Sequence, residues 1–211
     1  MQLELPQNQD NTVINKTNHI DGYILAGGKS SRMGVDKGLL LFNGKPLVQR
    51  IIEQLSPAVN KVIIVSNNRE YEKFGLEVIG DLIENIGPAG GIHAALSHAQ
   101  YEQIFVVSCD MPFITAHAAA YLIQQAVHSQ ITLPVHHGKT QALFGVYSGQ
   151  CLPKWKQLIE QGIIKLQVMT NHFDLLKIDI EKNELFFDSL FTNINDENDF
   201  NKALKQLKNG N

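Results

Sequence analysis

The sequence predicts a three-layer α/β/α fold of the Rossmann-like class, built on a mostly parallel, doubly wound sheet. Two observations carry this prediction. Short apolar runs rich in Val and Ile occupy residues 23–26, 62–65 and 104–107, and such continuous runs are typical of strands covered on both faces. Helix-like segments at residues 46–55 and 91–99 separate the runs, so that strands and helices alternate along the chain.

Shorter signals place the remaining elements. A strand is expected at 78–80, and Thr115 is in position to cap a helix at 116–127. The second half is less regular, with strands expected at 131–135, 142–147 and 175–180 and a last helix at 197–207. Residues 1–20 are rich in Asn, Gln and Thr, which predicts a loosely ordered leader before a single domain at 21–211.

Composition excludes several classes of protein. The chain has 211 residues with 18 Lys and Arg against 21 Asp and Glu and no basic run, which argues against a nucleic-acid surface. No stretch of about 18 apolar residues is present, so we expect no membrane span. With two cysteines and no signal-peptide pattern, the sequence predicts a cytoplasmic protein without a disulfide framework.

The strongest local feature is the glycine-rich segment at residues 25–37, which directly follows the first predicted strand. Gly27 and Gly28 allow the backbone to approach a ligand and to point N–H groups at phosphate oxygens. Arg32 and Lys37 add positive charge. The alternative is a glycine-rich turn whose cations face solvent. The segment matches neither the Walker A spacing nor the dinucleotide fingerprint, because each requires a further glycine.

This segment, LAGGKSSRMGVDK, resembles the LAGG-x-S-x-RMG-x-DK signature of the molybdenum cofactor guanylyltransferase family, a branch of the sugar-nucleotide-type pyrophosphorylase folds. Further matches follow in order at residues 80–81, 87–92, 109–113 and 191–195, so the resemblance covers about residues 22–205. It implies transfer of GMP from GTP to the molybdenum-loaded molybdopterin, release of pyrophosphate and a requirement for Mg²⁺. It also implies contacts with other molybdenum cofactor biosynthesis or target-enzyme proteins.

Asp110 is the residue that we expect to bind the metal. It follows the apolar run at 104–107, which puts its carboxylate at a strand end, where α/β sheets bind their ligands. Mg²⁺ takes one or two carboxylates together with substrate phosphates. The alternative is a turn aspartate before Pro112. The resemblance makes Asp110 the metal ligand, and we expect Lys37 and Arg32 to neutralise the charge that develops during transfer.

The resemblance also implies a nucleotide site. The residues expected to form it are Leu25, Ala26, Gly27, Gly28, Lys37, Asp81, Gly87, Gly90 and Asp110, and either Ser66 or Asn68 would replace an asparagine of the family. Asp81 follows a predicted strand and could meet the guanine base, the ribose or a metal ion. The glycines at 87–91 could bring a ligand close to the start of a helix or simply form a tight loop.

Asn193 and Asn195 are the expected acceptor-binding residues. They alternate along an extended segment, so both amides point to the same side. Asn195 or Asp196 is also expected to cap the last helix, and we favour capping over substrate contact for one of the two.

Other features favour ordinary structural roles. His136 and His137 are adjacent on a predicted strand and therefore point to opposite faces, which favours a solvated pair over a metal site. Cys109 has no identifiable base to activate it, so a buried packing residue is expected, and Trp155 and Phe144 are expected in the core.

Two alternatives to a guanylyltransferase remain open. One is a cytidylyl- or sugar-phosphate nucleotidyltransferase of the same fold, although Gly27 stands where those relatives more often carry a second alanine. The other is a non-catalytic nucleotide-binding regulatory module. The presence of Lys37, Asp81 and Asp110 together favours an enzyme.

Overall fold

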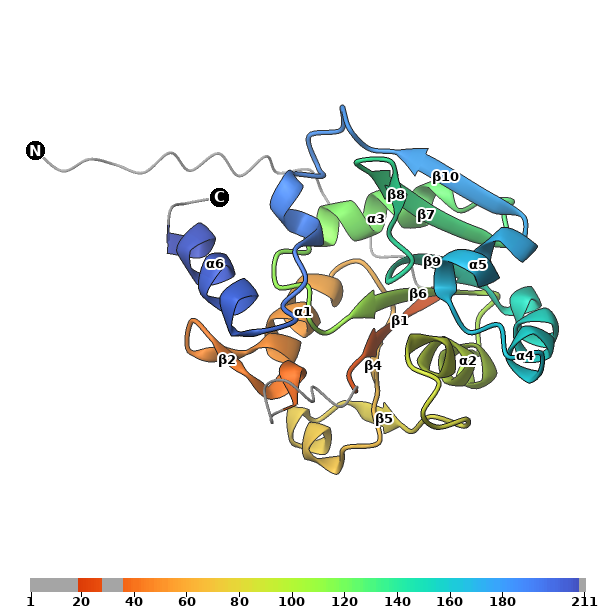
Figure 1. Cartoon of the computed structure of the whole chain (residues 1–211), viewed down its shortest axis with the longest axis horizontal. Coiled ribbons are helices and arrows are strands. Elements are labelled where there is room, and N and C mark those ends of the chain that lie inside the picture. Colours follow the sequence, from red (N-terminus) through yellow and green to blue (C-terminus); the bar gives the residue numbers. More distant parts are fainter. Residues whose placement is uncertain (1–18, 28–35, 209–211) are drawn as a thin grey trace, which may run out of the picture.

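The computed structural model describes residues 19–27 and 36–208, and within these ranges the chain folds around one eight-stranded sheet (Figure 1). The strand order is β10-β7-β9-β6-β1-β4-β5, with β8 paired to β7. The strands are β1 (Ile20–Leu25), β4 (Val62–Val65), β5 (Glu77–Ile79), β6 (Gln103–Ser108), β7 (Ile131–His136), β8 (Lys139–Thr140), β9 (Phe144–Ser148) and β10 (Leu175–Asp179).

The predicted mostly parallel sheet is confirmed. β1 lies between β4 and β6 and is parallel to both, and β4 is parallel to β5. At the other end, β10 is parallel to β7. The exception on this path is β9, which is antiparallel to both β6 and β7 and joins the two parallel halves.

Helices cover both faces of this sheet, as the predicted three-layer fold requires. Helices α1 (Leu47–Leu55) and α3 (Ala116–Gln125) pack on one face, and α2 (Pro88–His98) and α4 (Leu152–Glu160) pack on the other (Figure 1). Strand β1 shows why: Ile24 faces the α1 and α3 side, whereas Tyr23 and Leu25 face the α2 and α4 side. Trp155 and Phe144 are fully buried, so their predicted core positions are confirmed.

A short hairpin and the last helix close one end of the molecule. Strands β2 (Leu41–Phe42) and β3 (Lys45–Pro46) are joined by Asn43 and Gly44, which both have positive φ, at 51° and 79°. This Asn-Gly pair is a strong hairpin signal that the sequence reasoning did not use. Phe42 packs with Phe113 and Ile194 beside helix α6 (Glu197–Lys208).

Several predicted boundaries differ from the structure. Ile20, assigned to the leader, is buried in β1, while residues 1–18 lie outside the described part. Helix α2 begins at Pro88 rather than at Gly91, because proline fits the first turn of a helix. Thr115 caps α3 as predicted, and its side chain accepts a hydrogen bond from the Ala118 N–H at 3.1 Å.

Further elements were not predicted. They are the helices α4 and α5 (Leu166–Met169), the strand β8 and the 3₁₀ turns η1 (Lys37–Leu39), η2 (Arg69–Phe74), η3 (Gly149–Cys151), η4 (Thr170–His172) and η5 (Asp188–Phe191). Among the described residues, no helix has both the length and the apolar character needed to span a membrane.

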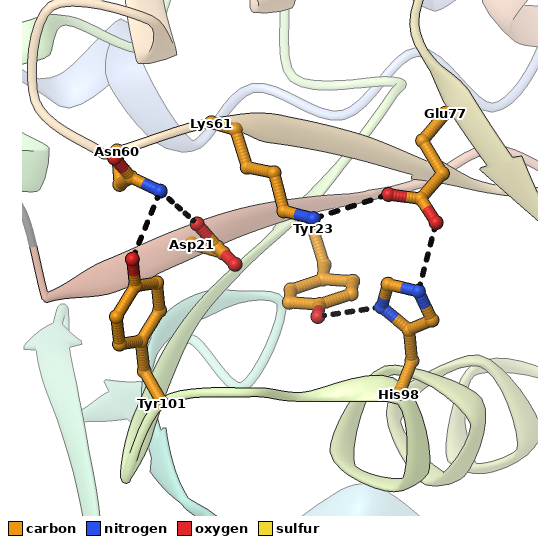
Figure 2. Close-up of polar contacts among 7 residues, drawn as sticks. All are labelled: Asp21, Tyr23, Asn60, Lys61, Glu77, His98 and Tyr101. Carbon is orange, nitrogen blue, oxygen red and sulfur yellow. Dashed lines mark hydrogen bonds and ion pairs between the residues drawn. The ribbon is translucent and has the colours of Figure 1, made fainter.

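The amino-terminal ends of β4 and β5 carry a polar network (Figure 2). One oxygen of Glu77 accepts from Lys61 at 3.1 Å, and the other lies 3.0 Å from Nε2 of His98. Nδ1 of His98 lies 3.0 Å from the hydroxyl of Tyr23. Burial, with the charge of Asp21, raises the pKa of this hydroxyl, so it stays protonated. The network links helix α2 to the sheet at the edge opposite the predicted site.

Candidate active site

Four neighbouring parallel strands end at one edge of the sheet, and each is followed by predicted site residues. In the order β5, β4, β1 and β6, these residues are Asp81, Ser66, Gly27 and Asp110. A Cβ added to Gly27 would lie 3.6 Å from the Ser66 hydroxyl, so these two loops are adjacent. The structure thus brings the predicted residues to the edge where α/β sheets bind ligands. Gly28 and Arg32 lie outside the described residues.

Lys37 and Asp110, 73 residues apart in the sequence, meet at the centre of this edge. The Lys37 ammonium lies 3.4 Å from Oδ2 of Asp110 and donates to Oδ1 of Asn195 at 2.9 Å. The side chains of Lys37 and Asp110 are 21% and 15% exposed, so both are partly shielded and still open to a ligand. A cation and a carboxylate in this setting can bind phosphate oxygens and a divalent metal ion respectively.

The position of Asp110 is fixed from three sides. Ser108 donates from its hydroxyl to Oδ1 of Asp110 at 2.6 Å. The backbone N–H of Cys109 donates to the Leu25 carbonyl at 3.1 Å, and the N–H of Ile194 donates to the Asp110 carbonyl at 2.9 Å. Burial raises the pKa of the Cys109 thiol, which supports its predicted packing role.

Lys37 is positioned through its neighbour Asp36. One oxygen of Asp36 accepts from the Gly38 N–H at 3.1 Å and from the hydroxyl of Tyr71, and the other accepts from Asn68 at 3.1 Å. Tyr71 is fully buried, and burial raises its pKa, so the hydroxyl remains a donor. The side chain of Asn68 therefore holds Asp36, while its nucleotide-binding role stays a prediction. Sequence reasoning missed Tyr71.

Asp81 is held by a residue that the sequence reasoning also missed. The backbone N–H of Asp81 donates to Oδ1 of Asn67 at 2.9 Å. A Cβ on Gly80 would lie only 2.8 Å from that oxygen, so a glycine is needed for the approach. Burial, and secondarily the charge of Glu84, raises the pKa of Asp81. Its carboxylate would gain from a hydrogen-bond donor on a ligand.

The fold itself requires glycine at two positions of the segment 87–91. Gly87 has a φ of 65° at the start of α2. A Cβ on Gly90 would lie 2.7 Å from the carbonyl of Ile83, so the preceding loop packs directly on the helix backbone. Ala89 is buried, and its carbonyl accepts from the indole of Trp155 at 3.0 Å. Nucleotide contacts of Gly87 and Gly90 stay predictions.

The predicted alternation of Asn193 and Asn195 agrees with the burial pattern. Both asparagines are exposed, and Ile194 between them is fully buried. Asp196 accepts from the Asp199 N–H at 2.9 Å near the start of α6. Asp196 therefore provides the helix cap, which leaves Asn195 free to contact Lys37.

A cavity of about 370 Å³ adjoins this site. Met111, next to Asp110, and Asn193 line it, and its far wall comes from the turn after β8 and from the start of α5. The residues that line it and that sequence reasoning did not identify include Thr140, Gln141, Lys165 and Gln167. The residues lie in the irregular second half of the chain, where no motif marks them. A cavity of this size suits a small organic ligand.

A Rossmann-like sheet with a lysine and an aspartate paired at its strand ends defines the chain as an α/β protein of the nucleotide-binding class. The chain belongs to the MobA-like NTP transferase domain family, whose family model matches residues 22–173. The chain is therefore a member of a family of nucleotidyltransferases.

Curated relatives and a solved structure agree with this assignment. A probable molybdenum cofactor guanylyltransferase of Flavobacterium johnsoniae is 36% identical over 85% of this chain and 93% of its own length. The molybdenum cofactor guanylyltransferase of Vibrio parahaemolyticus is 35% identical over 80% and 89%. The crystal structure of molybdopterin-guanine dinucleotide biosynthesis protein A from Archaeoglobus fulgidus has a TM-score of 0.77 and 26% identity, and the match covers 90% of this chain and 99% of that one. The predicted fold class is thus confirmed.

Proposed function

We propose that this protein transfers GMP from GTP to the molybdenum-loaded molybdopterin cofactor, releases pyrophosphate and forms the guanine dinucleotide form of the cofactor. The observation that carries the proposal is the pairing of Lys37 with Asp110 at 3.4 Å beside a cavity in the strand-end crevice. The names of the relatives support the choice of GTP and of the molybdopterin acceptor.

The donor set suits Mg²⁺. Asp110 offers a hard carboxylate ligand whose Oδ1 is oriented by Ser108, and a single carboxylate with substrate phosphates and waters is a common magnesium environment. When bound, Mg²⁺ would neutralise charge on the phosphates. Lys37 provides a second positive charge on the same side of Asp110.

The chemistry requires little proton transfer. An oxygen of the acceptor's terminal phosphate attacks the α-phosphorus of GTP and forms the new phosphorus–oxygen bond. The bond from the α-phosphorus to the oxygen bridging to the β-phosphate breaks, and pyrophosphate leaves with the electron pair. Because the attacking phosphate is already an anion, the protein positions both substrates and neutralises charge. We assign the neutralisation of charge to Lys37, and Arg32 remains a predicted contributor to it.

The acceptor fits the cavity beside Asp110. Asn193 and Gln141 offer amides to a polar ring system, and Lys165 offers a cation to its phosphate. Asp81, at the other end of the crevice, would accept hydrogen bonds from the guanine base. The proposal includes a cytoplasmic location and handover of the product to other cofactor-biosynthesis or target-enzyme proteins.

The test combines the purified chain with Mg²⁺, molybdenum-loaded molybdopterin and GTP, CTP, ATP or UTP in turn. We expect pyrophosphate release with GTP and a product containing guanine. A preference for CTP would replace this proposal with a cytidylyltransferase. Tight GTP binding without pyrophosphate release would instead indicate a regulatory module.

Asp110→Asn tests the metal role in the same assay. The substitution keeps the size of the side chain and removes its charge, so we expect kcat/KM to fall at least 100-fold, as for loss of a group that stabilises transition-state charge. Asp174→Asn is the matched control, because Asp174 is exposed and lies immediately before β10. Near-normal turnover of Asp110→Asn with Mg²⁺ would exclude Asp110 as the metal ligand.

A further inference from the structure

His136, His137 and Asp188 form a compact cluster outside the crevice residues described above. Oδ1 of Asp188 lies 3.2 Å from Nε2 of His136 and 3.6 Å from Nε2 of His137. One ligand atom from each of the three residues lies within 4.8 Å of the others. The two histidines and the aspartate come from segments about 50 residues apart in the sequence, so the tertiary fold brings them together.

The expectation that His136 and His137 point to opposite faces was wrong, because it assumed a continuous strand. His137 and Gly138 have φ values of 47° and 71° and form the two-residue turn between β7 and β8. The positive φ of His137 breaks the alternation of a strand. Its ring consequently lies beside that of His136, with centroids 4.0 Å apart, instead of on the opposite face.

The position of each ring is set by further contacts. The side chain of His136 is 11% exposed and packs on Phe191 with ring centroids 5.1 Å apart. The backbone N–H of His137 donates to the carboxylate of Glu181, whose other oxygen lies 3.5 Å from the His137 ring nitrogen Nδ1. Such a carboxylate behind a ligand histidine orients the ring and raises its basicity.

The charges of the cluster favour a cation. Asp188 and Glu181 bring two carboxylates to the two imidazoles, and the cation nearest in the fold is Lys139, which is paired with His136 across the β7–β8 hairpin. A single oxygen of Asp188 faces both His136 and His137, an arrangement in which a metal ion can satisfy all three groups at once. The Nε2 atoms of both rings face Asp188, and Nδ1 of His137 is directed to Glu181.

We propose that His136, His137 and Asp188 bind a first-row divalent metal ion of the Zn²⁺ type, in a site separate from Asp110. In a tetrahedral zinc site with bonds of about 2.0–2.1 Å, neighbouring ligand atoms lie about 3.3 Å apart. The two distances to Asp188, 3.2 and 3.6 Å, agree with that spacing. The two histidine nitrogens lie within 4.8 Å of each other, and a rotation of the exposed His137 side chain would bring them to the same spacing. Imidazole ligands favour Zn²⁺ over Mg²⁺, whereas Asp110 with phosphates has the opposite preference.

The site fastens two parts of the cavity wall to each other. His137 lies in the turn before β8, which leads to Thr140 and Gln141 on one wall. Asp188 begins η5, which leads to Asn193 on another. A metal ion shared by His137 and Asp188 therefore joins the β7–β8 hairpin to the segment that carries Asn193. The proposal does not depend on which substrate the cavity binds.

The experiment titrates Zn²⁺ into the full chain, first stripped of metal, in competition with a chromophoric chelator at pH 7.5. We expect one tight equivalent, retained in Asp110→Asn and weakened at least about tenfold in His137→Ala and in Asp188→Asn, since each removes a ligand. His172→Ala, another exposed histidine, is the matched control and should bind like the wild type. Binding should weaken at pH 5.5, because protonated imidazole does not bind metal.

Two further readouts separate a metal site from ordinary ion pairs. Co²⁺ in place of Zn²⁺ should give visible absorption typical of four-coordinate cobalt in the wild type and not in Asp188→Asn. Zn²⁺ should raise the Tm of the wild type and leave that of Asp188→Asn unchanged. Absence of tight Zn²⁺ binding, equal binding by Asp188→Asn, or loss of the equivalent in Asp110→Asn would each overturn the proposal.

Discussion

The buried hydroxyl of Tyr71 gives a direct test of how Lys37 is positioned. It donates to the carboxylate of Asp36, and Tyr71→Phe removes this donor without changing the packing of the ring. A hydrogen bond to a charged group contributes about 1.5–3 kcal/mol. Because the Gly38 N–H and Asn68 still donate to Asp36, we expect the lower part of that range, about 1.5–2 kcal/mol.

Two measurements follow from this magnitude. For a chain of this size, about 1.5–2 kcal/mol lowers the Tm by about 3–8 °C. If the whole loss acts through misplacement of Lys37, kcat/KM falls by no more than about 10- to 30-fold. Thermal unfolding and pyrophosphate release would measure the two effects on the same preparation.

Tyr101→Phe is the matched control for this prediction. The Tyr101 hydroxyl accepts from Asn60 at 3.3 Å in the polar region at the other edge of the sheet (Figure 2). We expect a smaller loss of stability, since this bond is neutral and long, and unchanged turnover. A Tyr71→Phe variant with the Tm and turnover of the wild type, or a Tyr101→Phe variant that loses as much activity, would refute the role of Tyr71 in holding Asp36.

Three further predictions concern other parts of the molecule. Gly90→Ala should destabilise the fold by about 1–3 kcal/mol, because its Cβ would lie 2.7 Å from the Ile83 carbonyl; an unchanged Tm would contradict the close approach. Asn195→Ala removes an acceptor of the active-site ammonium and should lower kcat/KM by about 2- to 10-fold with an unchanged Tm, which steady-state kinetics would detect. The hydrogen bond from Lys61 lowers the pKa of Glu77 below its ordinary value of 4.5, so this contribution to stability is present above pH 4.5 and is lost as pH falls through the folded-state pKa. In Glu77→Gln, the free energy of unfolding in urea should depend less on pH in that acidic range than in the wild type. The difference should be less than about 1 kcal/mol, because the Glu77 side chain is 46% exposed, and the same pH dependence in both proteins would contradict the prediction.

Local patterns predicted the elements that depend on local forces. The apolar run at Val62–Val65 is the strand β4 with the same bounds, and Thr115 caps α3. The start of α2 was placed three residues late, because Pro88, Ala89 and Gly90 were read as a loop although Ala89 and Gly90 are buried inside the helix. Helix propensity disfavours glycine, and here packing against the Ile83–Ile86 loop prevails.

In the candidate site too, local patterns predicted some residues and contacts between distant segments decided others. The strand-end positions of Asp81 and Asp110 were predicted, because chain order and strand ends are readable from apolar runs. Tyr71 and Asn67, which position Lys37 and Asp81 through their neighbours, were missed. Neither belongs to a motif, and their hydrogen bonds join segments 35 and 14 residues apart.

The sequence by itself determined the α/β class, the succession of the main strands along the chain and the residues at their ends, since these depend on periodicity and on short motifs. Only the tertiary structure decided that β9 runs antiparallel between β6 and β7, that Ile194 binds the Asp110 carbonyl, and that His136 and His137 face Asp188. These features depend on pairing between distant segments and on a single positive φ at His137, and neither leaves a periodic signal in the chain.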